Sequence, residues 1–317
     1  MTSVREIRRR KTVIQSTAQI IRGMKLIATV RLTKDRAREE AFRPYFEELR
    51  GMGAMVLEER EWPEERKGPA GIVAFTSNRG LAGGYSQQIV RMIAGDGRFL
   101  PGTAVVYAVG KRGRDSLAAM GYEIRGDYSE AGERPDGVLA EKLAGRLLED
   151  YEAGEIGEIY LAYTVFRSAV VQEPRLIRVL PAETEDGRKA EDGLETEDGL
   201  KSENSLGQES GLAAMREETA GTGRAGTGEM EYEPDREQLR ERMLPWYMGG
   251  MIYGACLEAA ASENGARMRA MDSAAGNGKK LLEELELQYN RARQDTITRE
   301  LTEIAAGAGE IMEQEEG

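Results

Sequence analysis

Apolar residues at both ends of the chain recur at helical or near-heptad intervals, and polar residues fill most of the positions between them. Such a stripe is too narrow to cover a broad core, so each helix needs a partner helix. The first stripe consists of Val4, Ile7, Ile14, Ala18, Ile21, Met24, Ala28 and Leu32. The second consists of Leu285, Tyr289, Ala292, Thr296, Leu301, Ile304, Ala308 and Ile311. Together they predict an antiparallel coiled coil formed by residues 1–60 and 230–317.

Each of these two helices contains a proline. Pro44 should kink the first helix or break it briefly, because the proline ring removes a backbone donor and clashes with the preceding turn. Pro245 is expected to mark a restart after a short first piece of the second helix. At about 1.5 Å per residue, some 55 helical residues would reach roughly 80 Å, which is longer than a typical domain is wide.

Between residues 68 and 182 the pattern changes to short apolar runs that alternate with helical segments. Apolar runs bounded by glycine and other turn residues are typical of buried strands. The predicted strands are 71–77, 103–110, 155–167 and 170–181, and the predicted helices are 85–95, 111–121 and 138–154. Because strands and helices alternate, this region is predicted to form an α/β domain with an open twisted sheet, inserted between the coiled-coil helices.

Residues 183–229 differ in composition from both neighbouring regions. The acidic unit EDGL repeats, residues 183–218 hold twelve acidic side chains against four basic ones, and no aromatic residue occurs. A segment this polar cannot bury enough apolar surface to offset the entropy of ordering it. We therefore expect an acidic, low-complexity insertion without fixed structure.

The first 38 residues are strongly basic, with eleven lysines and arginines against two acidic side chains, although the whole chain has a formal charge of −12. Three interpretations fit this segment: a solvated helix face, a surface for an acidic protein partner, or a surface for nucleic acid. Nucleic acid is disfavoured, because no aromatic side chain stands among the first 40 residues to stack on bases. The other two interpretations stay open.

Side chains that usually carry catalysis are scarce in this sequence. The chain has no histidine, and its one cysteine, Cys256, lies in an apolar stretch that favours a small buried residue. The loop SNRGLAGGYS at 77–86 stands where a strand meets a helix, but it matches neither common phosphate-binding pattern. Glycines that permit a tight turn are its favoured explanation. We predict no catalytic, cofactor-binding or metal site.

No stretch of the chain approaches the roughly 20 apolar residues that span a bilayer. The basic N-terminal segment also lacks the apolar core of a signal peptide, since Arg8, Arg9 and Arg10 stand where that core would be. We therefore expect an intracellular protein with no direct membrane insertion, so that any association with a membrane runs through a partner.

Three stretches of the sequence resemble one family. Residues 5–32 form a basic segment that contains threonine and glutamine and leads into GMKLIATV. The loop at 77–86 is similar to a glycine-rich turn of the same family, and residues 263–308 resemble its C-terminal signature almost from end to end. On these motifs the chain resembles the γ subunits of F-type ATP synthases. The resemblance covers both ends and the middle of the chain and leaves out 182–229.

This resemblance implies a fold and a function. In this family the terminal helices form an antiparallel coiled coil with an inserted Rossmann-like α/β domain. The coiled coil is the rotor shaft inside a ring of three α and three β subunits, and it couples ion-driven rotation to ATP synthesis or hydrolysis at the β subunits. The α/β domain packs near the ε subunit and the membrane c-ring. The implied location is peripheral, on the cytoplasmic face of the bacterial plasma membrane.

The resemblance also carries over individual residues that touch the β subunits or couple rotation to catalysis. In the C-terminal helix these are Arg293, Gln294, Thr298, Glu300, Thr302 and Glu303. In the N-terminal helix they are Met24 and Lys25, where basic charge would complement an acidic loop of the β subunit. The chain departs from the family pattern at Gln288, Asp295 and Arg299, which changes the detail of these contacts.

Two alternatives belong to other classes of protein. A coiled-coil scaffold with an α/β head that binds an acidic protein partner needs no ring, so the stoichiometry of the complex separates it from a shaft. A nucleotide-using enzyme would bind nucleotide as the isolated chain. For the acidic insertion, a tolerated surface extension is favoured over a segment that folds back on basic surface and restrains rotation. Deletion of 183–228 with no change in turnover or in its inhibition would exclude the second role.

Overall fold

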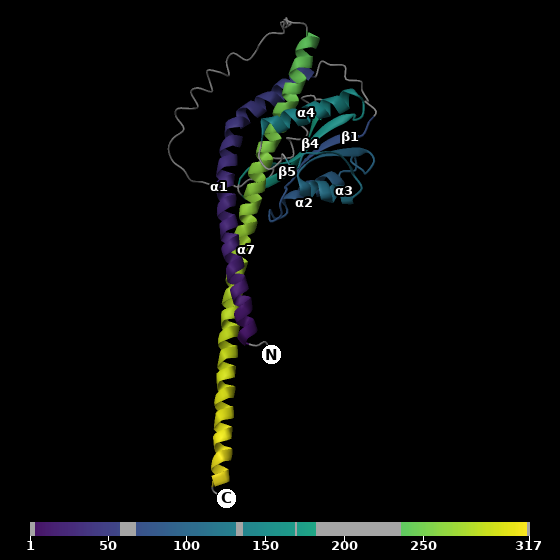
Figure 1. Cartoon of the computed structure of the whole chain (residues 1–317). Helices are drawn as coiled ribbons and strands as arrows, with labels where there is room; N and C mark the ends of the chain where they lie inside the picture. The colour runs from purple at the N-terminus through teal and green to yellow at the C-terminus, as the bar shows by residue number, and fades with distance from the viewer. Residues whose placement is uncertain (1–3, 58–67, 131–135, 169, 182–235, 316–317) are drawn as a thin grey trace, which may run out of the picture.

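The computed structural model describes residues 4–57, 68–130, 136–168, 170–181 and 236–315. The prediction for the acidic insertion lies outside these residues. The described chain is elongated: two long helices run side by side, and an α/β domain packs against one end of the pair (Figure 1). The inserted domain between two paired terminal helices is the architecture that the sequence predicted, and it is confirmed.

The two long helices are α1 (Val4–Leu57) and α7 (Arg236–Glu315), and neither is interrupted. The expected restart at Pro245 is therefore wrong, and Pro44 does not break α1. Both prolines are exposed, so the carbonyl groups that lose a helical donor can bond to solvent. Figure 1 shows α1 curving towards its C-terminal end.

The two helices run antiparallel. Near the N-terminus of α1, Lys11 Nζ lies 3.0 Å from Glu286 Oε1. Closer to the α/β domain, Asn264 Nδ2 donates a hydrogen bond to Asp35 Oδ2 at 2.8 Å. As the residue number rises along α1, that of its neighbour on α7 falls by a similar amount, which is the register of an antiparallel pair. The predicted coiled coil is confirmed.

Glycines of α7 allow the two helices to approach closely beside the domain. A Cβ atom built on Gly250 would overlap the side chain of Leu49, and one built on Gly254 would overlap the ring of Phe46. Leu49 and Phe46 are both buried in the main hydrophobic core. The absence of a side chain on these glycines is therefore what lets α1 pack against α7 at this point.

The α/β domain contains a five-stranded sheet of order β3-β2-β1-β4-β5. The first four strands in this order are parallel, and β5 pairs with β4 in the antiparallel direction. The strands are β1 (Ala70–Phe75), β2 (Ala104–Val109), β3 (Glu123–Asp127), β4 (Glu158–Phe166) and β5 (Gln172–Leu180). The four strands predicted from apolar runs are present, and β3 was missed. Its sequence, EIRGD, is short and polar, and it lies exposed or half-buried at the edge of the sheet.

Helices cover both faces of the sheet. α2 (Tyr85–Gly95) and α3 (Lys111–Ala119) pack on one face, where their apolar residues join those of β1, β2 and β4. α4 (Gly137–Glu152) and the first part of α7 pack on the other. Buried residues of α7 between Leu244 and Ala259 belong to the main hydrophobic core, which lies on this face of the sheet. α7 is thus part of the domain and part of the coiled coil, so the two cannot separate without exposing core.

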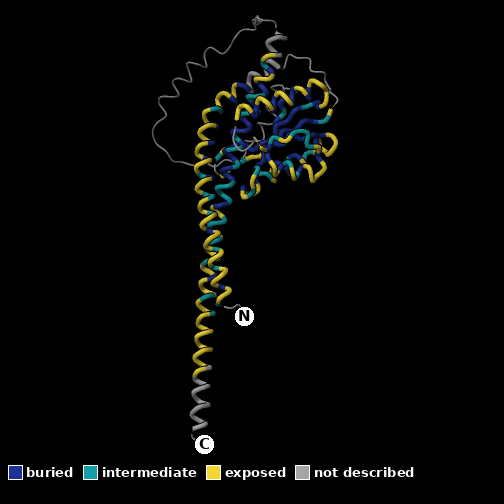
Figure 2. The backbone as a smooth tube through the Cα atoms, in the orientation of Figure 1, coloured by how far each residue is buried: buried dark blue, intermediate teal, exposed yellow. Residues whose placement is uncertain are grey.

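Figure 2 shows that burial is concentrated in the α/β domain and at its junction with the two helices, whereas the rest of the coiled coil is mostly exposed. The buried apolar residues of α1 before residue 40 are Ile7, Ala18, Ala28 and Leu32, all from the stripe that the sequence predicted. A coiled coil held by one such stripe leaves most of its circumference free for contact with other molecules.

Candidate functional site

The residues carried over from the family resemblance lie in two groups that the structure keeps apart. Met24 and Lys25 lie in the middle of α1, where Lys25 forms an ion pair with Asp272 of α7. The other group begins at Arg293, which is about 30 Å further along α7 at the usual rise of about 1.5 Å per residue. The structure therefore places these residues at two separate positions along the helix pair.

The second group begins about level with Val4, the first described residue of α1, and continues on a part of α7 beside which the structure describes no other helix. α7 continues past the N-terminal end of α1 as a single helix (Figure 1). Leu285 is the last buried residue among the side chains that the structure describes, and every described side chain beyond Ala292 is exposed. The exposed members of the group are Arg293, Gln294, Thr298, Glu300 and Thr302. Glu303 lies on the same helix, with its side chain outside the described part.

This single helix presents apolar as well as polar side chains. Ile297, Leu301 and Ile304 are exposed by 43%, 62% and 69%, and their spacing places them along one face of the helix. The hydroxyl groups of Thr296 and Thr302 each donate to the carbonyl oxygen four residues earlier, at 2.8 Å. An exposed apolar stripe on an unpaired helix is typical of a surface that another protein covers.

Met24, in the first group, lines a cavity of about 440 Å³ between α1, α7 and the loop that follows β1. The loop contributes Asn78, Arg79, Gly80 and Leu81. Leu81 is 58% exposed, and its φ of 67° lies in the left-handed region that residues other than glycine rarely adopt. Sequence reasoning missed that this loop faces Met24, because a loop's pattern does not show which helix it will meet. The only available signal was that both belong to segments that resemble the family.

The loop after β1 is fixed by hydrogen bonds to its neighbours. Asn78 Nδ2 donates to the carbonyl oxygen of Ser129 at 2.6 Å, and Asn78 Oδ1 accepts from the backbone N–H of Lys111 at 3.0 Å. The backbone N–H of Ser77 donates to Ser86 Oγ at 3.1 Å. These bonds tie the loop to the starts of α2 and α3, which supports the interpretation of the glycine-rich stretch as a tight turn.

Cys256 is buried in the core, as the sequence predicted. Burial raises the pKa of its thiol to about 12, so the nucleophilic thiolate is not formed near neutral pH. Within the described residues, no cluster of three or more acidic, histidine or cysteine side chains is arranged to hold a metal ion. Among the same residues, no helix is both long and apolar enough to cross a membrane.

The fold and its exposed surfaces define the class of protein: a coiled-coil shaft with one free helical end and an α/β domain packed on the other end. Comparison with known proteins specifies this class further. A family model described as ATP synthase matches residues 3–310. The ATP synthase gamma chain of Lachnoclostridium phytofermentans is 41% identical over 98% of this chain and 100% of its own length. The sodium ion specific gamma chain of Acetobacterium woodii is 33% identical over 96% of this chain and 98% of its own.

Solved structures share the same fold. A chain of the Euglena gracilis mitochondrial ATP synthase, in a structure of OSCP, F1 and c-ring, superposes with a TM-score of 0.64 at 18% identity and covers 97% of this chain and 94% of its own. A chain from the central stalk and c-ring of the Tetrahymena thermophila enzyme superposes with a TM-score of 0.53 at 19% identity, covering 80% and 99%. At these identities the likeness shows the arrangement of terminal helices and inserted sheet.

The chain belongs to the family of ATP synthase gamma chains, which form the central-stalk rotor of F-type ATP synthases. The catalytic sites of that complex lie on the β subunits. The family and the rotor function predicted from the sequence resemblance are thereby confirmed.

Proposed function

We propose that the free end of α7 enters a ring of three α and three β subunits and that residues 293–303 contact the β subunits in turn. The observation that carries this proposal is that α7 continues past α1 as a single exposed helix (Figure 1). In this proposal the shaft comprises 1–60 and 230–317, the α/β domain comprises 68–182, and 183–229 is an insertion.

The surface of the free helix suits contacts that form and break during rotation. Permanent burial of a large apolar surface would stabilise one angle far more than the others. The polar groups on the rest of the helix surface instead let several orientations have similar energies. The apolar residues Ile297, Leu301 and Ile304 lie along one face, so the subunit that they touch changes with the angle of the shaft.

Met24 and Lys25 are proposed to meet an acidic part of the β subunits. The side chains of Lys25 and Asp272 are 43% and 66% exposed in their ion pair. Exposed ion pairs contribute only about 0–1 kcal/mol, so Lys25 can exchange Asp272 for a carboxylate of another subunit at little cost. Leu81, exposed at the same cavity, adds an apolar contact to this surface.

The α/β domain is proposed to face the ε subunit and the membrane c-ring. It lies at the end of the molecule opposite the free end of α7 (Figure 1). Two of the similar solved structures are described as a rotor and as a central stalk with c-ring, which supports the c-ring as a partner. The chain is then a peripheral subunit on the cytoplasmic face of the bacterial plasma membrane. Ion selection is expected in the c-ring and not in this chain.

The test is co-expression with the α and β subunits from the same source, followed by native mass and ATPase turnover of the purified complex. We expect one copy of this chain for every three αβ pairs. Arg293→Ala and Gln294→Ala should each lower turnover several-fold, because both side chains stand on the free helix. Lys280→Ala is the matched control, since Lys280 is also exposed on α7 but lies on the part that pairs with α1.

Two outcomes would contradict the proposal. If the chain fails to enter a ring and is isolated as a stable dimer or bound to a different acidic protein, the coiled-coil scaffold becomes the better account. If Lys280→Ala lowers turnover as much as Arg293→Ala, the effect does not come from contacts of the free helix.

A further inference from the structure

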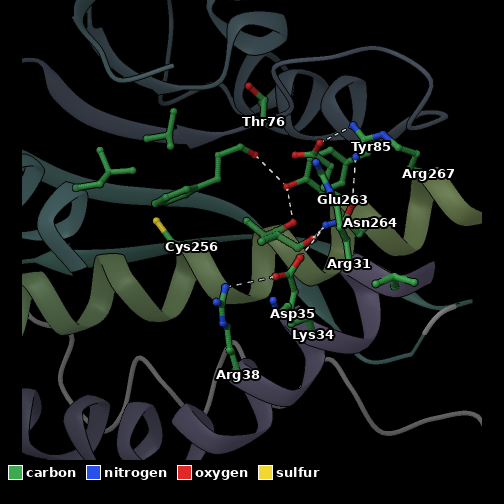
Figure 3. Close-up of a pocket in the computed structure, with 16 residues that line it drawn as sticks. Arg31, Lys34, Asp35, Arg38, Thr76, Tyr85, Cys256, Glu263, Asn264 and Arg267 are labelled. Carbon is green, nitrogen blue, oxygen red and sulfur yellow. Dashed lines mark hydrogen bonds and ion pairs between the residues drawn. The ribbon is translucent and has the colours of Figure 1, made fainter. Parts of the chain in front are cut away.

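A second cavity, of about 320 Å³, lies between the two shaft helices and the carboxyl edge of the sheet (Figure 3). Phe75 and Thr76, at the end of β1, and Val109, at the end of β2, form part of its wall. Open α/β sheets bind ligands outside the carboxyl ends of their strands, and small-molecule pockets typically measure about 300–1,000 Å³. The position and the size of this cavity are those of a site for a small molecule.

The inner wall of this cavity is apolar. Phe75, Val109 and Leu139 are buried and come from β1, β2 and α4. Tyr85 also lines the wall, but its hydroxyl group already donates to the carbonyl oxygen of Ala259 at 3.1 Å. A wall of this kind favours the hydrocarbon or aromatic part of a ligand over a polar one.

The outer rim of the cavity is basic. α1 contributes Arg31, Lys34 and Arg38, and α7 contributes Arg267 (Figure 3). No ion pair joins Arg31 or Lys34 to a side chain in the part of the chain that the structure describes. These two cations are therefore available to an anionic group that enters the cavity.

The acidic side chains of the rim are already partnered within the protein. Glu263 Oε1 forms an ion pair with Arg267 Nη2 at 2.5 Å. Asp35 accepts a hydrogen bond from Asn264 at 2.8 Å and lies 3.8 Å from Arg38. Each acid thus has its direct contact with a side chain other than Arg31 and Lys34, although Arg31 lies near enough to both acids, and Lys34 to Asp35, to lower the pKa values that burial raises. Four cations face two acids, so the rim keeps an excess of positive charge.

We propose that this cavity binds an amphipathic anion, namely a small carboxylate or phosphate monoester with an aliphatic or aromatic body. The body lies against Phe75, Val109 and Leu139, and the anionic group pairs with Arg31 and Lys34. Hydrogen bonds between charged groups are stronger than neutral ones, and removal of the apolar body from water adds affinity in proportion to its area. An inorganic anion has no apolar body to remove from water, and a neutral hydrocarbon forms no charged hydrogen bond.

A ligand in this cavity touches α1, α7 and the sheet at the same time. It ties the shaft to the α/β domain and stabilises the folded chain as its occupancy rises. This function is separate from the contacts of the free end of α7 proposed above, because the cavity lies beside the domain. The cavity adjoins the one that Met24 lines and shares Arg31, Glu263, Asn264 and Arg267 with it.

The test is binding to the purified full chain, measured by calorimetry and by the midpoint of thermal unfolding. Octanoate and octyl phosphate are the anionic probes, octanamide is a neutral probe with the same body, and acetate is an anion without the body. We expect saturable binding of one octanoate per chain and a raised midpoint. Octanamide and acetate should bind at least about tenfold more weakly, and the ratio between octanoate and octyl phosphate shows which anionic group the site prefers.

Substitutions locate the binding to this cavity. Arg31→Gln combined with Lys34→Gln should weaken octanoate binding at least about tenfold, whereas Arg22→Gln, at an exposed position of α1 away from the cavity, should leave it unchanged. Ala260→Leu, which adds volume at the cavity wall, should abolish binding, with circular dichroism as the check on folding. Octanoate binding that is absent, that survives the double substitution, or that octanamide equals would overturn the proposal.

Discussion

Glu258 places a carboxyl group in the interface between α7, α1 and the sheet. Burial first, and the nearby carboxylate of Glu39 second, raise its pKa to about 7. Arg175 of β5, Arg43 of α1 and the backbone N–H of Phe166 act in the opposite direction. Glu39 is itself held by two hydrogen bonds from Arg43, at 2.8 and 2.9 Å. The folded chain therefore contains an acid that is only half ionised near neutral pH.

The raised pKa of Glu258 makes stability depend on pH in a defined direction. Between about pH 4.5 and 7 the folded chain holds a proton that the unfolded chain releases, so the contribution of this group to the free energy of unfolding falls as pH rises. Glu258→Gln removes the cost of ionising the buried acid. We expect the variant to exceed the parent in stability by about 1–3 kcal/mol at pH 8 and to show no such gain at pH 5.

Urea unfolding of the full chain at several pH values between 5 and 8 measures this difference. Glu141→Gln, at an exposed position of α4, is the matched control and should leave the pH dependence as it is in the parent. A gain from Glu258→Gln that is the same at pH 5 and pH 8 would show that packing, and not ionisation, causes it.

At the scale of elements, the sequence predicted those helices and strands that the local spacing of apolar residues defines. The long helices and four of the five strands follow from the spacing of apolar residues, which is a local property. β3 (Glu123–Asp127) is polar and becomes a strand because it pairs with β2 at the edge of the sheet, a tertiary contact that its own sequence does not show. The error at Pro245 has the same origin, since packing of α7 against the domain keeps the helix continuous through the proline.

The close approach of α1 and α7 gives a prediction about helix glycines. Alanine in place of a helix glycine usually stabilises by about 0.5–1 kcal/mol, and we expect this for Gly276→Ala, where no atom lies within 4 Å of the added Cβ. Gly254→Ala should instead destabilise by about 1–3 kcal/mol, because its Cβ overlaps the buried ring of Phe46. Urea unfolding of both variants at one pH measures the contrast. Stabilisation by both would mean that the helices do not pack closely at Gly254.

At the scale of the whole molecule, the relative position of the two helices decides which residues can be functional. The sequence predicts two facing stripes, but a shift of one helix by a heptad would keep those stripes in contact, so the pattern alone does not fix the register. The structure fixes it by pairing Lys11 with Glu286, which places Val4, the first described residue of α1, about level with Arg293. Beyond this point the structure describes no other helix beside α7 (Figure 1). The family resemblance supplied the residue positions, and the register explains why they are exposed.

Removal of 293–317 should separate folding from function. The described side chains of this segment are exposed, so its loss should change the free energy of unfolding of the full chain by less than about 1 kcal/mol. ATPase turnover of the complex with α and β should nevertheless fall several-fold, because the surface proposed to contact the β subunits is gone. Urea unfolding of the truncated chain and turnover of its complex measure the two effects.

The two measurements of this truncation have to be interpreted together. A loss of stability that parallels the loss of turnover would show that the segment supports the coiled coil and is not a free contact surface. Turnover that survives the truncation would mean that contacts around Met24 and Lys25 are sufficient to couple the shaft to the ring. Since Lys25 stands about 30 Å from the start of the free end, its substitution in the truncated chain would then be expected to abolish the remaining coupling, whereas in the full chain it should lower turnover only in part.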